Sequence, residues 1–267
     1  MTAWYHKFFS VGLLAGLVLL SGRVISAQET KLKVADPLGD AARFIDDQTL
    51  AVVKIDITKI DAVANLQFSA DIFKPSKEEL SQALSKVEEL KREILKAGGG
   101  QFFLILSMQD VPDGGPLVVA MVKDGENTDA LANLLGMAPE FGKLEKIGGM
   151  LLGGNPKVVA RARQMKGSAR PELATALQAG KEGAAVRLAV ALTGDTKRVV
   201  REMLPPLPPQ LGGADPKALV DGFQWLSVSL EGMPHLGLKA TLQARDASAA
   251  KELATVLQAG MGLLVGQ

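Results

Sequence analysis

The sequence predicts an α+β fold made of two ferredoxin-like β-α-β-β-α halves, with antiparallel sheets covered on one face by helices. Paired apolar runs separated by Pro, Gly and Asp indicate antiparallel hairpins. A long amphipathic stretch indicates a covering helix. The stretch "VKDGENTDALANLLGM", from Val122 to Met137, is also echoed by "ARDASAAKELATVLQAGM", from Ala244 to Met261. This echo predicts an internal duplication.

The first half contains one clear buried strand and one clear helix. The β-branched run Thr49–Ile57 predicts a buried strand, and Thr58 is placed to cap a short helix after it. Ser76 and Glu79 have the spacing of a capping box, and they open an amphipathic helix that ends at the glycines from Gly98 onward.

A predicted hairpin follows this helix, with strands in "QFFLILSMQ" and "LVVAMVKD" joined by "DVPDGGP". A helix is expected from Asn127 or Thr128, with Leu131, Leu134 and Leu135 facing inward. A glycine-interrupted strand pair is expected in residues 141–154.

The second half repeats this order of elements. "AAVRLAVAL" replaces the first strand, and "FQWLSVSLEG" and "LGLKATLQARD" replace the hairpin. The segment "PPLPPQLGGADPKALVDG" stands where the first half has its long helix, and we expect "LPPLPPQ" in it to be a stiff connector. A polyproline II ligand is the alternative. The predicted organisation is a signal peptide at 1–27, an N-terminal linker at 28–48, a first repeat at 49–155 and a second repeat at 156–267.

The N-terminus resembles a secretory signal. The apolar run Phe8–Leu20 is shorter than the roughly 20 residues that a spanning helix needs, and Arg23 follows closely. Ile25 and Ala27 occupy the minus-three and minus-one positions before Gln28. We therefore expect cleavage after Ala27 and an exported protein, periplasmic or secreted. An uncleaved anchor is the alternative.

Composition limits the partners and the chemistry of the exported chain. After removal of 27 residues, 240 of 267 remain, with 28 basic residues (30 minus Lys7 and Arg23) and 29 acidic residues. A net charge near −1 predicts no binding to nucleic acid, and no second apolar stretch predicts a membrane span after signal cleavage. The chain has no Cys, so its stability depends on core packing.

Catalytic and metal-binding motifs are scarce. His235 is the single histidine of the exported chain and is expected in an exposed turn. With neither Cys nor a second His, a zinc site cannot form from such ligands. Because no G-x-S-x-G motif is present either, we predict no catalytic, cofactor-binding or metal-binding residue.

One segment could bind an anion at a helix start. Its candidate residues are Gly153, Gly154, Asn155, Lys157 and Arg161. A simpler interpretation explains most of the same residues, with glycines for a tight strand exit, Asn155 as N-cap and Pro156 at the first helical position. Four acids, Asp46, Asp47, Asp110 and Asp113, could form a catalytic or cation-binding pair. We expect them to be solvated loop acids.

Four stretches together resemble a group of uncharacterised exported proteins typical of planctomycete bacteria. These stretches are "DDQTLAVVKIDITKID", "RPELATALQAG", "PPLPPQLGG" and "FQWLSVSL". The resemblance implies export and a duplicated α+β architecture. It carries over no functional residue.

Two classes of function follow from these observations. The first is a non-enzymatic exported protein that binds a protein, peptide or envelope component through a sheet face or a groove between the halves. The second is a hydrolase that uses carboxylates alone. A large exposed apolar patch favours the first, and a cleft with buried acids of raised pKa favours the second.

Overall fold

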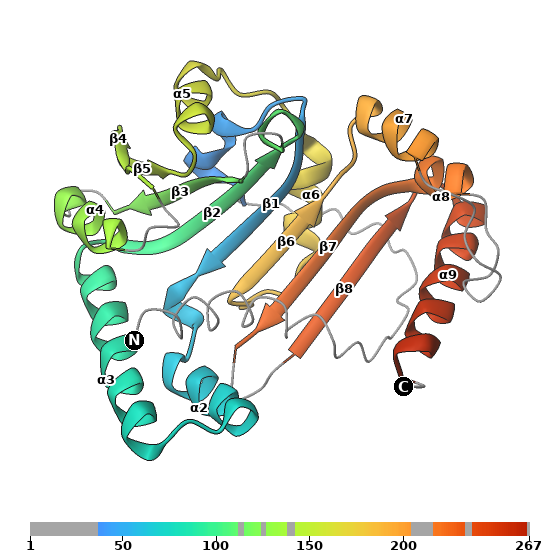
Figure 1. The fold of residues 1–267 in the computed structure, drawn as a ribbon. Coiled ribbons are helices and arrows are strands. Elements are labelled where there is room, and N and C mark those ends of the chain that lie inside the picture. The colour runs from blue at the N-terminus through green and yellow to red at the C-terminus, as the bar shows by residue number, and fades with distance from the viewer. Residues whose placement is uncertain are drawn as a thin grey trace.

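The computed structural model describes residues 37–111, 115–123, 127–137, 142–203, 216–232 and 237–265. Within these ranges, eight strands form one antiparallel sheet in the order β4-β5-β3-β2-β1-β6-β7-β8 (Figure 1). The predicted α+β class is confirmed. The expectation of separate sheets is wrong, because β1 and β6 pair antiparallel and join the two halves. The predicted signal peptide lies outside the described residues.

The first part of the chain supplies five strands. Its elements are η1 (Gly39–Phe44), β1 (Thr49–Asp56), η2 (Ile57–Lys59), α2 (Ala62–Phe73), α3 (Lys77–Lys96), β2 (Gly99–Ser107), η3 (Met108–Asp110), β3 (Leu117–Val122), α4 (Thr128–Gly136), β4 (Glu145–Ile147) and β5 (Met150–Gly153).

The second part supplies the other three strands. Its elements are α5 (Pro156–Gln164), α6 (Pro171–Ala179), β6 (Val186–Val190), α7 (Gly194–Met203), α8 (Pro216–Gly222), β7 (Phe223–Glu231), β8 (Gly237–Ala244) and α9 (Ala247–Val265). Among the helices in the described ranges, none is long and apolar enough to cross a bilayer.

Helix starts follow the local sequence signals, except that Asp61 caps α2 and the prediction that Thr58 does so is wrong, because Thr58 lies inside η2. Ser76 and Glu79 form the predicted capping box at the start of α3. Asn127 caps α4 by accepting a hydrogen bond from the backbone N–H of Ala130. Asp246 accepts one from the N–H of Ala249 at the start of α9. These side chains satisfy donors that an isolated helix start leaves unpaired.

Both predicted hairpins are present, since β2 pairs antiparallel with β3 and β7 with β8. In addition, β1 pairs directly with β2, and β6 with β7. A ferredoxin-like unit instead splits its helix-linked strands by another strand. Each half of this protein therefore contributes a three-stranded antiparallel meander to the common sheet.

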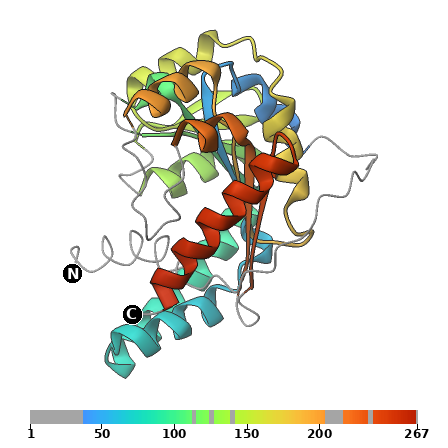
Figure 2. The ribbon, with the colours of Figure 1, turned by 90° about the vertical axis from the view of Figure 1, so that its right-hand side faces the viewer.

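Helices cover both faces of the sheet, although the sequence predicts cover on one face only. The neighbours Phe102 and Phe103 point to opposite faces, and both are buried. Phe103 belongs to a core beneath η1, α5 and α6, whereas Phe102 belongs to a core beneath α4. Figure 2 shows helices on either side of the strands. The second cover was missed because β3 is a continuous apolar run whose two faces cannot be separated by pattern.

The described part of the predicted linker is integral to the core. Ala41 and Phe44 in η1 are 0% exposed, and Ile45 after it is 1% exposed. All three belong to the main core cluster with Val52 and Phe103. Residues 37–48 therefore pack as part of the folded domain.

Candidate functional site

The centre of the sheet carries a continuous aliphatic surface on the face shared with α4 and α9. We call it the aliphatic face. Its fourteen residues alternate along five neighbouring strands and lie opposite one another in register: Ala51, Val53, Ile55, Leu104, Leu106, Val186, Leu188, Val190, Leu226, Val228, Leu230, Leu238, Ala240 and Leu242. Thirteen of them are half-buried and Ala240 is exposed.

The reverse face of β1, β2 and β6 is packed at its centre. Val52, Ile105 and Ala189 are at most 1% exposed, although each lies between two residues of the aliphatic face. Because residues of the aliphatic face are half-buried while their neighbours on the reverse face are buried, the aliphatic face has less cover than its reverse. A contiguous apolar surface with incomplete cover is a candidate interaction site.

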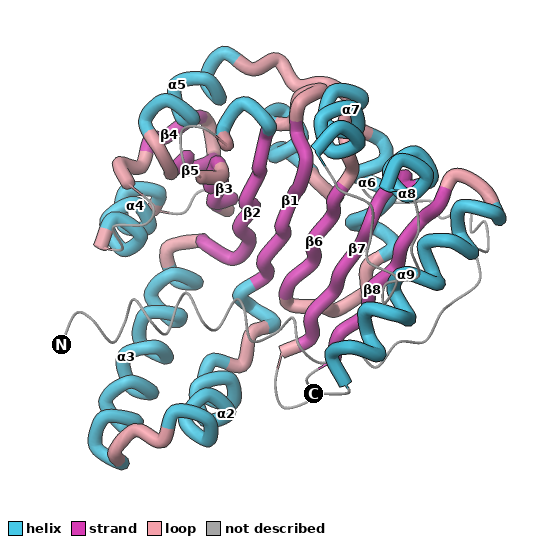
Figure 3. The backbone as a smooth tube through the Cα atoms, turned by 45° about the vertical axis from the view of Figure 1, so that its right-hand side comes forward, coloured by secondary structure: helices cyan, strands magenta, loops and turns pink. Residues whose placement is uncertain are grey.

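Two helices border the aliphatic face. At one end Leu131 and Leu135 of α4 pack on Phe102 of β2, and at the other Leu253 of α9 packs beside Leu242 of β8. Figure 3 shows β1, β6 and β7 in view between these two helices. Because β1, β2, β6 and β7 each have hydrogen-bonded strands on both sides, a partner can contact this region only through side chains.

A pocket of about 550 Å³ lies at the end of the face where β1 leaves the sheet. Its apolar walls include Ile60, Val63 and Leu95, and its charged side chains are Lys59, Asp61, Glu88, Lys91 and Arg92. The pocket begins at Thr58, directly after Ile57, which packs on the α4 core together with Ile55 of the aliphatic face. The pocket and the face are thus adjacent along the chain.

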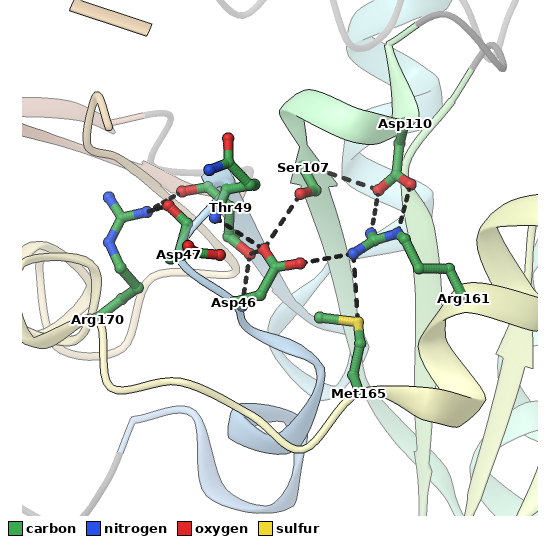
Figure 4. A network of polar contacts seen from close by, with 9 residues as sticks. Asp46, Asp47, Thr49, Ser107, Asp110, Arg161, Met165 and Arg170 are labelled. Atoms are coloured by element: carbon green, nitrogen blue, oxygen red, sulfur yellow. Dashed lines mark hydrogen bonds and ion pairs between the residues drawn. The ribbon is translucent and has the colours of Figure 1, made fainter. Parts of the chain in front are cut away.

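Arg161 on α5 forms the centre of a separate polar network (Figure 4). Its Nε and Nη2 donate to the two oxygens of Asp110 at 3.0 and 2.6 Å, and its Nη1 donates to Asp46 Oδ2 at 2.6 Å. Asp46 Oδ1 also accepts from the hydroxyls of Thr49 at 2.8 Å and Ser107 at 3.2 Å. The network ties the N-terminal segment, the end of β2 and α5 together.

The expectation of solvated loop acids is wrong for Asp46 and Asp110. The Asp110 side chain is 2% exposed and the Asp46 side chain 20%, and both form salt bridges with Arg161. Asp47 is exposed as expected, and Asp113 lies outside the described residues. The sequence contains no local signal for these salt bridges, because Arg161 and Asp46 are 115 positions apart.

The residues of the predicted anion site form a helix start. Gly153 ends β5, and Gly154 has a φ of +123° with Pro116 O only 2.9 Å from where a Cβ would be. Asn155 Oδ1 accepts from the N–H of Lys157 at 2.9 Å, which confirms it as the N-cap. With Arg161 engaged by Asp46 and Asp110, anion binding at this place stays a prediction.

A second arginine joins three backbone segments. Arg170 donates through Nη1 to the carbonyls of Thr49 and Asp47 and through Nη2 to that of Ala191. It also pairs with Glu172. Arg170 thus ties the segment before α6 to both β1 and the end of β6, and its role is structural.

The titratable side chains of the described residues form no second candidate site. In the ranges that the structure covers, no three His, Asp or Glu side chains gather as a metal site would require. A hydrogen bond from the Ser76 side chain lowers the pKa of Glu79, and one from the Ala249 backbone lowers that of Asp246. Both groups belong to helix starts, Glu79 in the capping box of α3 and Asp246 ahead of α9. His235 lies outside the described residues.

Comparisons with known proteins add no relative. The chain matches no protein-family model, no curated protein and no solved structure. The aliphatic face with its adjacent pocket is therefore identified from the structure alone.

Proposed function

We propose that this protein is an exported, non-enzymatic binding protein whose aliphatic face is its binding surface. The observation that carries the proposal is the set of fourteen half-buried or exposed aliphatic positions without a charged or aromatic member, on the reverse side of the buried residues Val52, Ile105 and Ala189. Such a surface offers hydrophobic contact and no hydrogen bond from a side chain. It suits an apolar partner.

We further propose that the fold arose by duplication of a β-α-β-β-α half. The order β1-α2-α3-β2-β3-α4 parallels β6-α7-α8-β7-β8-α9, which supports the duplication. Because β1 pairs directly with β2 and β6 with β7, the repeated unit is an antiparallel meander and differs from the split ferredoxin-like arrangement. Export rests on the leader-like residues 1–27, and the apolar partner would then belong to the periplasm, the envelope or the medium.

The alternative, a carboxylate-based hydrolase, has less support. Asp46 and Asp110 lie close together, but Arg161 bonds to both carboxylates. A glycosidase pair needs one carboxyl group that holds a proton at working pH. All four carboxylate oxygens of Asp46 and Asp110 already accept hydrogen bonds within the network, so neither carboxyl group faces a substrate.

The proposal can be tested with the chain from residue 28 to 267 and the neutral apolar dye Nile red. We expect saturable binding with a rise in fluorescence. Leu188→Gln, in the middle of the aliphatic face, should weaken binding about tenfold, because an amide facing an apolar ligand loses on the order of 1.4 kcal/mol. Arg187→Gln, on the same strand but the opposite face, is the matched control. No saturable binding, or equal loss in both variants, would contradict the proposal.

A further inference from the structure

We infer that the aliphatic face accommodates the hydrocarbon chain of a long-chain fatty acid, with the carboxylate held by cations at the adjacent pocket. The inference rests on the proposed binding function and names its ligand. Three features of the described residues support it: the composition of the face, the helices that border it, and the charge of the pocket at its end.

The composition favours a hydrocarbon chain. The face consists of Ala, Val, Leu and Ile side chains. It presents neither an aromatic ring for stacking nor a polar side chain that would fix the orientation of a peptide or a sugar. The backbone amides of its central strands are already paired in the sheet. A ligand therefore gains affinity here only through burial of apolar area, at about 25 cal/mol per Å².

The bordering helices argue against a second copy of this sheet as the partner. Two sheets that pack face to face lie about 10 Å apart. Helices α4 and α9 stand on the same face, and a helix with its side chains is itself about 10 Å across. A flat partner would meet the helices before it reached Val53 or Leu188. A slender chain is not obstructed in this way.

The pocket supplies charge at one end of the face. Its lining includes three cations, Lys59, Lys91 and Arg92, and two acids, Asp61 and Glu88. Asp61 caps α2 by accepting from the N–H of Ala64 at 2.9 Å. Lys59 pairs with Asp56 at 3.4 Å, and Lys91 donates to the carbonyl of Ile60 at 2.5 Å.

Arg92 lies 3.8 Å from Glu93 and its side chain is 68% exposed, so it is the most accessible cation of the pocket. A guanidinium can bind a carboxylate through two parallel hydrogen bonds. A ligand with one anionic group at the end of an apolar chain matches a pocket that has three cations and two acids.

The volume of the pocket agrees with this role. At about 550 Å³ it falls within the range of roughly 300–1,000 Å³ that is typical of small-molecule sites. Its lining includes the apolar residues Ile60, Val63 and Leu95 and begins at Thr58, one residue after Ile57, which packs on the α4 core with Ile55. A ligand with its carboxylate beside Arg92 can therefore place its first methylenes against these apolar residues and the rest along β1.

The test compares oleate with oleyl alcohol, which has the same chain and no charge, on the chain from residue 28 to 267. We expect both to displace Nile red, with oleate the tighter ligand. Arg92→Gln should weaken oleate about tenfold and leave oleyl alcohol unchanged. Lys59→Gln should act in the same direction. Lys86→Gln, on the exposed surface of the same helix and outside the pocket, is the control. Circular dichroism checks that each variant is folded.

The outcomes separate the inference from the proposed function. Equal affinity for oleate and oleyl alcohol, with no effect of Arg92→Gln, would overturn the fatty-acid inference and leave the apolar binding function standing. Binding of an amphipathic helical peptide but of neither lipid would also overturn it. If Nile red, oleate and oleyl alcohol all fail to bind, both the inference and the proposed function are wrong.

Discussion

The two ends of the sheet follow the same order of elements but differ in how they are covered. Strands β3 and β5 are buried almost throughout, whereas the residues of β8 are half-buried or exposed except for Ala244. On β7 buried and half-buried residues alternate, with Trp225, Ser227 and Ser229 on the buried side. Strands β3 and β5 are therefore packed on both faces, whereas β7 is packed on one. A similar order of elements thus produces a stabilising core at one end of the sheet and a half-buried surface at the other.

The difference has a local cause in the helices between the first two strands of each half. In the first half, Ala97 is the C-cap of α3, is 5% exposed and packs in the same cluster as Phe102 and Leu131. In the second half, the seven-residue α8 stands at that place in the order, and its Leu219 packs toward α9. The cover over Leu188 and Val228 is correspondingly thinner.

The largest effect should come from one substitution made at both ends of the same face. Leu151 on β5 is 2% exposed, so Leu151→Ala should lower the free energy of unfolding by about 2–5 kcal/mol. Leu226 on β7 is half-buried, and Leu226→Ala should cost only about 1 kcal/mol. Urea denaturation followed by circular dichroism measures both. Equal losses would show that the two ends are equally packed and would remove the contrast.

The next effect concerns the Arg161 network, which belongs to the packed end. Arg161→Ala would leave the carboxylate of Asp110 buried without its partner, so we expect a loss of about 3 kcal/mol. Arg163→Ala is a matched control, because Arg163 lies on the same helix and pairs with Glu145 while 55% exposed. Its loss should stay below about 1 kcal/mol.

A second variant tests the physical reason for that loss. Asp110→Asn added to Arg161→Ala removes the unpaired charge, so the double variant should regain part of the stability that Arg161→Ala loses. Thermal unfolding of the single and double variants measures this coupling. Strictly additive losses would mean that the charge of Asp110 plays no part.

Local signals explain what the sequence predicts well. Ser76 with Glu79, and Asn155 with Pro156, define helix starts within four residues, and both starts are observed. The two hairpins are joined by short polar segments and are also correct. In each case the interacting groups are close in sequence, so composition and spacing contain the necessary information.

Long-range contacts explain which features the sequence does not predict. The pairing of β1 with β6 joins residues more than 100 positions apart, and nothing local indicates that the two halves share a sheet. The alternation in "FQWLSVSL" is visible in sequence, but whether Leu226 and Val228 face a core or the open side depends on the helices above them. Pattern alone assigns them to an interior. The aliphatic face became evident only from burial.

The smallest expected effect on stability concerns two helix starts, one in each half, where a carboxylate accepts hydrogen bonds. Hydrogen bonds to the ionised carboxylates lower the pKa of Glu79 at α3 and of Asp246 at α9. A folded-state pKa below the unfolded value stabilises the protein above the unfolded pKa, and this stabilisation disappears as pH falls through the folded pKa. Glu79→Gln and Asp246→Asn should therefore each lower the melting temperature slightly at neutral pH. The difference in melting temperature from the parent should shrink once the pH falls below the ordinary carboxyl pKa, which is 4.5 for Glu and 3.8 for Asp.

Two serine variants are the controls. Ser76→Ala should reproduce the acid dependence of Glu79→Gln, whereas Ser81→Ala, exposed inside α3, should leave the acid dependence unchanged. A difference that persists undiminished at acid pH would show that the caps contribute through something other than their charge.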